Sequence, residues 1–173
     1  TPDTDFFFPG SRHLEALSHL QFGIASGSLT MLTGEVGLGK TLLCRHLLRH
    51  PPENTRFAYL LNPDQSYGGL LASIYEDLAG QVPKDASLGS LQRELPKLLL
   101  QLAEGGEQVA VLVDEAHRLS GKVLEGLRLL SNLDTEKEKL MCLLLVGQPE
   151  LEQKLATRAL RPLAQRISVR YRL

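Results

Sequence analysis

Residues 28–41 read SLTMLTGEVGLGKT, and this stretch decides the fold. Its first half, 28–34, predicts a short strand, and a glycine-rich turn leads from it into a helix expected over 40–49. Gly34 to Thr41 match the pattern G-x-x-x-x-G-K-[ST] at every fixed position, in the strand–turn–helix context that the motif requires. The glycines let backbone N–H groups converge on phosphate oxygens, and the helix N-terminus adds partial positive charge. The stretch therefore predicts a loop that binds the phosphates of a nucleotide.

The side chains of this loop have separate expected roles. Lys40 should reach the β- and γ-phosphates, and the Thr41 hydroxyl should bind Mg²⁺. A glycine-rich turn that binds nothing is the alternative, and the complete motif in its context argues against it. The residues expected to contact the nucleotide are Gly34, Glu35, Val36, Gly37, Leu38, Gly39, Lys40, Thr41 and Leu42.

Short apolar segments alternate with amphipathic ones along the whole chain. Strands are predicted over 28–34, 56–62, 108–115, 139–147 and 167–173, and helices over 11–25, 40–49, 68–79, 88–104, 121–132 and 149–156. Pro96 is expected to kink or divide its helix, because proline lacks the backbone N–H. Central strands that are apolar throughout predict a five-stranded parallel sheet covered on both faces, which is a three-layer α/β domain. We expect a core over 28–173, preceded by a segment and helix over 1–27.

Two acidic residues end the predicted strand 108–115. Asp114 is expected to hold Mg²⁺ together with Thr41, and Glu115 is placed to orient and polarise an attacking water. This pair predicts hydrolysis of ATP to ADP and phosphate, and the lack of an N-K-x-D motif favours adenine over guanine. His117 follows closely, and we expect it only to cap or pack.

The segment LLLVGQPEL, residues 143–151, ends a buried strand with a polar amide, Gln148. Ligands of open parallel sheets bind at the carboxyl ends of the strands, where this residue is expected. Gln148 is therefore either a turn residue or a contact to the γ-phosphate or its attacking water.

The composition is that of an ordinary globular protein. The chain has 173 residues, of which 43% are hydrophobic and 23% charged, enough for one domain with a core. The net charge of −1 gives no bulk bias toward nucleic acid or anionic membranes. Cys44 and Cys142 have no metal-ligand spacing and are predicted to be buried free thiols. The chain begins at Thr1 and stops inside a predicted strand, so we expect a fragment of a longer protein.

Several further segments carry a family resemblance. FFFPGSRHLEALSHLQFGI (6–24), VLVDEAHRLS (111–120), LRLLSNL (127–133), LVGQPEL (145–151) and LRPLAQRI (160–167) occur in this order. Together with the phosphate loop, they resemble the AAA+ ATPase domain of the general secretion pathway A (GspA/ExeA) family. The resemblance spans nearly the whole chain and implies an AAA+ type P-loop fold, from which the helical lid is absent.

The resemblance implies roles for further residues. Gln148 would be sensor 1, a polar side chain near the γ-phosphate, although many AAA+ proteins have asparagine there. Asn62 would restrain the catalytic glutamate, and the alternative is that it only forms an Asn-Pro turn. Arg166, or else Arg161, would reach into a neighbouring subunit's site, the alternatives being a solvated basic face or a DNA contact. The N-terminal residues that would contact adenine are His13 and Leu14.

The resemblance also implies a cellular role. Family members act at the cytoplasmic face of the bacterial inner membrane and continue into a membrane helix and a peptidoglycan-binding region. They work with a GspB/ExeB partner on the secretin of type II secretion, and a homo-oligomer is expected. Pilus biogenesis is one alternative. A DNA-dependent AAA+ ATPase is another, and the net charge of −1 makes nucleic acid an unexpected partner.

Overall fold

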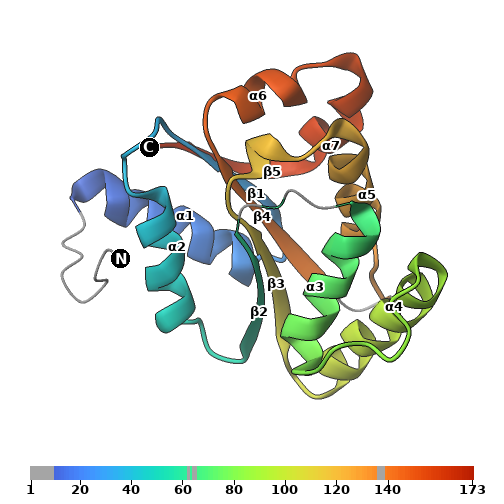
Figure 1. The fold of residues 1–173 in the computed structure, drawn as a ribbon. Coiled ribbons are helices and arrows are strands. Elements are labelled where there is room, and N and C mark those ends of the chain that lie inside the picture. The colour runs from blue at the N-terminus through green and yellow to red at the C-terminus, as the bar shows by residue number, and fades with distance from the viewer. Residues whose placement is uncertain (1–9, 62, 64–65, 136–138) are drawn as a thin grey trace.

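A computed structural model describes residues 10–61, 63, 66–135 and 139–173 of the chain (Figure 1). Five strands form one sheet in the order β2-β3-β4-β1-β5, and every pairing between them is parallel. The strands are β1 (Leu29–Thr33), β2 (Thr55–Leu60), β3 (Gln108–Val113), β4 (Met141–Gly147) and β5 (Ile167–Arg172). The helices are α1 (Ser11–Ala25), α2 (Lys40–Arg49), α3 (Tyr67–Ala79), α4 (Leu88–Glu104), α5 (Gly121–Ser131), α6 (Glu150–Leu155) and α7 (Arg161–Arg166), with short 3₁₀ helices η2 (Ala116–Arg118) and η3 (Arg158–Leu160).

Helices cover both faces of the sheet, with α1 and α2 on one side and α3, α4 and α5 on the other (Figure 1). Side chains alternate along each strand, so neighbours point to opposite faces. Leu144 of β4 packs in the core beneath α1 and α2, and Leu143 packs in the core beneath α3 to α5. The prediction of a three-layer domain with a five-stranded parallel sheet is confirmed.

Most of the predicted elements are present within about two residues of their expected bounds. The exception is the effect of Pro96, which does not divide α4; the helix runs unbroken from Leu88 to Glu104. A proline inside a helix lacks one hydrogen bond and crowds the carbonyl one turn before it, but Leu95 and Leu99 are fully buried on either side of Pro96 and their packing stabilises the helix. Ser87 caps the helix by accepting a hydrogen bond from the backbone N–H of Ser90.

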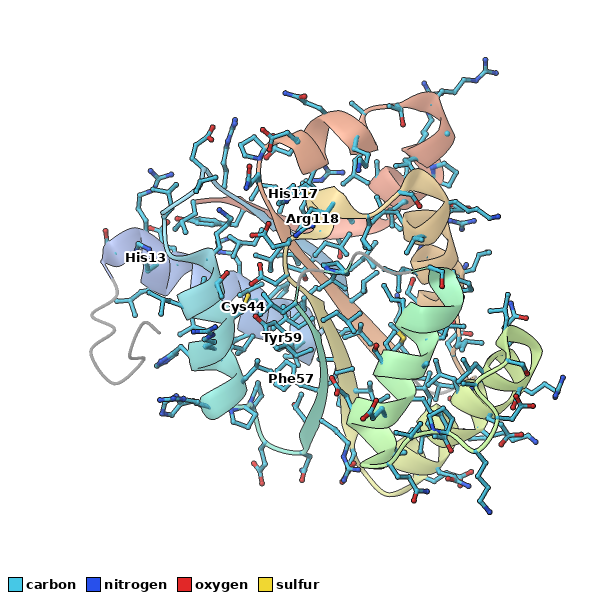
Figure 2. The ribbon with its side chains drawn as sticks, viewed as in Figure 1. His13, Cys44, Phe57, Tyr59, His117 and Arg118 are labelled. Atoms are coloured by element: carbon cyan, nitrogen blue, oxygen red, sulfur yellow. The ribbon has the colours of Figure 1, made fainter. Side chains whose placement is uncertain are left out.

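The two cysteines are free and buried, as predicted. Burial raises the pKa of the Cys142 thiol to about 12. Burial also raises the pKa of the Cys44 thiol well above its usual value, and the negative charge of Asp114 adds to this effect. Cys44 lies with Phe57 and Tyr59 between α2 and the sheet (Figure 2). Within the described part of the chain, every helix is too short or too polar to cross a bilayer.

Candidate active site

The carboxyl ends of three adjacent strands bring the predicted motifs together. In the sheet, β4 lies between β1 and β3, so the strand that leads to Gln148 separates the phosphate loop from the acidic turn. Thr33, the last residue of β1, pairs with Gly147, and Val113 of β3 pairs with Leu145. The residues that follow the three strands therefore lie at one edge of the sheet.

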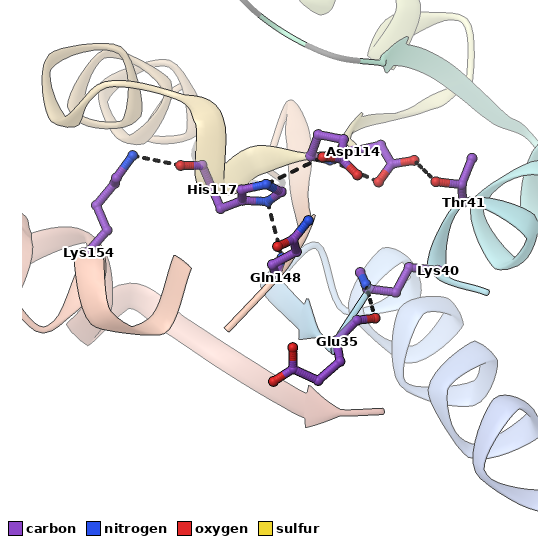
Figure 3. A network of polar contacts seen from close by, with 8 residues as sticks. Glu35, Lys40, Thr41, Asp114, His117, Gln148 and Lys154 are labelled. Atoms are coloured by element: carbon purple, nitrogen blue, oxygen red, sulfur yellow. Dashed lines mark hydrogen bonds and ion pairs between the residues drawn. The ribbon is translucent and has the colours of Figure 1, made fainter. Parts of the chain in front are cut away.

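The phosphate loop follows β1 directly. Gly37 and Gly39 have φ angles of +85° and +87°, in the left-handed region where residues with a β-carbon are strained. Gly34 donates its N–H to the Gly147 carbonyl over 3.1 Å, which joins the start of the loop to the end of β4. Lys40 is buried, and its Nζ donates to the Glu35 carbonyl over 2.7 Å (Figure 3). This hydrogen bond closes the loop on its own lysine.

Thr41 and Asp114 lie in direct contact at the start of α2. The Thr41 hydroxyl donates to Asp114 Oδ2 over 2.8 Å, and the Tyr59 hydroxyl donates to the same oxygen over 3.2 Å. Asp114 is fully buried. A hydroxyl and a carboxylate are the oxygen donors that Mg²⁺ prefers beside a nucleotide, so the two residues fit a magnesium ion at this point.

Tyr59 is a part of this site that sequence reasoning missed. Burial raises the pKa of its hydroxyl far above the usual value, and the charge of Asp114 raises it further, so Tyr59 stays a hydrogen-bond donor. A tyrosine near the end of an apolar strand was the only signal. Its contact depends on the pairing of β2 with β3, which places Tyr59 opposite Leu112.

Glu115 lies at the start of the turn that follows β3. Its φ of +56° and ψ of +34° place a non-glycine residue in the left-handed region, an uncommon conformation that often marks functional sites. Its N–H donates to Asp114 Oδ1 over 2.8 Å, and its Oε2 lies 3.3 Å from His117 Nε2. The partner of the Glu115 carboxylate is therefore the ring of His117.

His117 and α6 connect this turn to the other two strand ends. The Gln148 N–H donates to His117 Nδ1 over 3.1 Å, and Lys154 Nζ donates to the His117 carbonyl over 2.7 Å (Figure 3). Glu152, also on α6, accepts a hydrogen bond from the Thr33 hydroxyl at the end of β1. The sequence contained no motif for Lys154 or Glu152. We expected His117 only to cap or pack, and the structure gives its ring two polar partners.

The predicted adenine residues lie beside the phosphate loop at the start of α1. His13 Nε2 donates to the Leu38 carbonyl over 2.7 Å, so the ring lies against the loop. Leu14 is 51% exposed. Their contacts to a base stay a prediction. Asn62 lies outside the described residues.

Arg166, the first candidate arginine, lies away from the phosphate loop of its own chain. Arg166 ends α7 just before Ile167, which pairs with Leu29, the first residue of β1. The phosphate loop follows the other end of β1, roughly 13 Å further along the sheet. Arg161 begins α7 and is exposed, whereas Arg166 is partly buried. Arg166 therefore lies at the opposite edge of the sheet from the phosphate loop, and its action on a neighbouring molecule stays a prediction.

The profile of the AAA domain family matches residues 24–155, which include every motif placed at the strand ends above. The chain belongs to the AAA domain family. It is also 45% identical over 174 residues to General secretion pathway protein A of Aeromonas hydrophila. That alignment covers all of this chain and 32% of the relative, so this AAA domain spans about a third of that protein's length. The resemblance stated from the motifs is confirmed.

Solved structures share the architecture of this AAA domain at low sequence identity. The ORC2 protein of Aeropyrum pernix, solved in ADPNP–ADP complexes, superposes with a TM-score of 0.73 at 18% identity, over 99% of this chain and 50% of that one. Cdc6p of Pyrobaculum aerophilum gives a TM-score of 0.66 at 21% identity, over 96% of this chain and 47% of that one. These similarities confirm the AAA+ P-loop fold.

Proposed function

We propose that this AAA domain binds ATP with Mg²⁺ and hydrolyses it to ADP and phosphate. The observation that carries the proposal is the 2.8 Å hydrogen bond between Thr41 and Asp114. It joins the phosphate loop to the acidic strand end, so the groups for a phosphate, a metal and an attacking water belong to one site.

Each group in the site has one task in this proposal. Lys40 and the backbone N–H groups of the loop bind the phosphates, and Thr41 and Asp114 hold Mg²⁺, which neutralises charge on the phosphate oxygens. Glu115 polarises the attacking water by accepting its hydrogen bond. Gln148 contacts that water or the γ-phosphate from the middle strand of the site.

In this proposal a neighbouring copy of the chain supplies one further positive charge, an arginine side chain. Transfer of a phosphoryl group spreads negative charge over its oxygens, and an arginine can stabilise that charge. Arg166, with Arg161 as the second candidate, would enter the site of the next molecule in a homo-oligomer. The position of Arg166 at the far edge of its own sheet supports this arrangement.

Glu115→Gln tests the hydrolysis. The substitution keeps the size of the side chain but removes the charge that polarises water, so kcat should fall by about 100-fold or more while ATP affinity is retained. Glu104→Gln, an exposed residue at the end of α4, is the matched control and should hydrolyse like the wild type. Hydrolysis at the wild-type rate by Glu115→Gln would remove Glu115 from its assigned role.

The relative's name motivates the cellular part of the proposal. We assign this domain to the cytoplasmic face of the bacterial inner membrane, where it would drive assembly of the type II secretion secretin with a GspB/ExeB-like partner. Peptidoglycan binding would belong to a region outside this chain. Lys40→Ala in the chromosomal gene should then block secretin assembly. Loss of pili with intact secretion would instead support the pilus alternative.

Exposed arginines favour a second candidate function, a DNA-dependent ATPase. The exposed members of this group, on η3, α7 and β5, are Arg158, Arg161, Arg170 and Arg172. Binding to DNA phosphates through such residues weakens steeply with salt. ATP turnover that increases when duplex DNA is added at low salt, with no such increase at high salt, would support this function. The net charge of −1 argues against it.

A further inference from the structure

The ring of His117 lies between the carboxylate of Glu115 and the end of β4. Its Nε2 is 3.3 Å from Glu115 Oε2, and its Nδ1 is 3.1 Å from the backbone nitrogen of Gln148. The side chain of His117 is 13% exposed and that of Glu115 is 26% exposed, so both contacts are partly shielded from water. Neither the motif nor the roles assigned above give His117 a task.

The two contacts determine which nitrogen of His117 carries the proton. A backbone N–H can only donate, so Nδ1 must offer its lone pair to Gln148. The ring proton then lies on Nε2, which faces Glu115 and can donate to its carboxylate. The N–H of Gln148 thus keeps His117 in the tautomer that binds Glu115.

The position of the ring is held from two further sides. A β-carbon on Gly147 would lie 3.1 Å from both the backbone nitrogen and Nδ1 of His117, so the end of β4 packs tightly on the histidine. Lys154 Nζ donates to the carbonyls of His117 and Leu119, over 2.7 and 2.6 Å, and so ties the turn to α6. Side chains held in this way can orient a reacting group within a fraction of an ångström.

We propose that His117 is a positioning residue that sets the orientation of the Glu115 carboxylate and couples it to the strand end carrying Gln148. The proposal rests on the proposed function, because it assumes that Glu115 polarises the attacking water. A movement of Gln148 toward or away from the γ-phosphate shifts its backbone N–H. His117 transmits that shift to Glu115, so the water-polarising group responds to the state of the nucleotide.

Two substitutions at His117 separate its two contacts. In His117→Asn the amide oxygen can still accept from the Gln148 N–H, but the side chain is too short to reach Glu115. In His117→Gln the amide nitrogen can take the place of Nε2 and donate to Glu115. Misplacing a reacting group by about 1 Å costs on the order of 100-fold in rate, so His117→Asn should lower kcat by about 10- to 100-fold. His117→Gln should stay within about 3-fold of the wild type, because it keeps the contact that positions Glu115.

The assay is ATP turnover by the full-length protein, with ATP affinity and thermal unfolding measured on the same samples. His50→Asn, an exposed histidine after α2, is the matched control and should not change turnover. The proposal requires lower kcat in His117→Asn at unchanged ATP affinity and Tm, with recovery in His117→Gln. Equal losses in both variants, no loss in either, or a loss that follows Tm would overturn it.

A double substitution asks whether His117 acts through Glu115. Glu115→Gln combined with His117→Asn should be no slower than Glu115→Gln alone, because the second change then has nothing left to orient. A further drop of the size seen in His117→Asn alone would mean an independent role and would refute the coupling. Normal turnover by Glu115→Gln would instead undo the proposed function, so the two failures are distinguishable.

Discussion

The Thr41 hydroxyl donates a 2.8 Å hydrogen bond to Asp114, a residue 73 positions later in the chain. This bond joins the start of α2 to the end of β3 across the intervening strand β4. Because both residues are already in contact, the two oxygens proposed to hold Mg²⁺ would need little reorganisation when a nucleotide binds. The same contact explains why the site depends on the order of the strands as well as on its motifs.

Lys40→Ala should abolish useful nucleotide binding. The lysine is the buried cation of the loop, and its loss removes charge-assisted hydrogen bonds to phosphate, so Kd for ATP should rise on the order of 100-fold. Isothermal titration with an ATP analogue measures this. Lys122→Ala, an exposed lysine on α5, serves as the control. ATP affinity that survives in Lys40→Ala would undo the assignment of the phosphate loop.

Gln148→Ala tests the side chain that follows β4. The backbone N–H that binds His117 remains in this variant, so only the amide side chain is removed. Loss of a polar contact made in the transition state should lower kcat by about 10- to 100-fold with ATP affinity retained. Gln153→Ala, an exposed residue on α6, is the control. Unchanged kinetics would return Gln148 to the role of a turn residue.

Arg166→Ala should suppress turnover in the assembled full-length protein by about 1,000-fold, the effect of removing a trans-acting arginine in related chemistry. Nucleotide binding should persist, because Arg166 lies at the far edge of its own sheet. Steady-state hydrolysis and ATP affinity measured together check both statements. If Arg166→Ala turns over normally, Arg161 becomes the better candidate.

Mixing two inactive variants gives a sharper test of this arginine. Arg166→Ala molecules keep an intact nucleotide site, and Lys40→Ala molecules keep an intact Arg166. A mixed oligomer should therefore recover hydrolysis at the Arg166→Ala sites, where a Lys40→Ala neighbour supplies the arginine. Mixtures that stay as inactive as their components would argue against a residue that acts between molecules.

Gly23→Ala should destabilise the fold through the contact between α1 and β1. A β-carbon at Gly23 would lie 1.9 Å from the Thr30 hydroxyl oxygen, so the helix or the strand must shift. Such overpacking costs about 1–3 kcal/mol, or several degrees in Tm for a chain of this size. The control is Gly89→Ala in α4, where the nearest atom is the flexible Arg93 side chain at 3.5 Å. Thermal unfolding should show a lower Tm for Gly23→Ala and no loss for Gly89→Ala.

Local patterns were enough to predict most of the helices and strands and to propose the main groups of the candidate site. The predicted phosphate loop from Gly34 to Thr41 is a single stretch, so its glycines, lysine and threonine can be recognised from their spacing alone. Asp114 and Glu115 follow a continuously apolar strand, and Gln148 follows another. The expected division of the helix at Pro96 was wrong, because a local rule for proline takes no account of the buried leucines beside it in α4.

The sequence by itself predicted which side chains would bind phosphate, metal and water, because each of these tasks needs a residue type at a fixed spacing within one segment. Only the tertiary structure decided how those side chains are held. The contacts that hold them join separate segments of the chain. Tyr59 donates to Asp114, and Lys154 donates to the turn after β3. His117 contacts both Glu115 and the backbone of Gln148. Such contacts follow from strand order and register, which arise from burial of the whole sheet between two helical layers rather than from any local pattern.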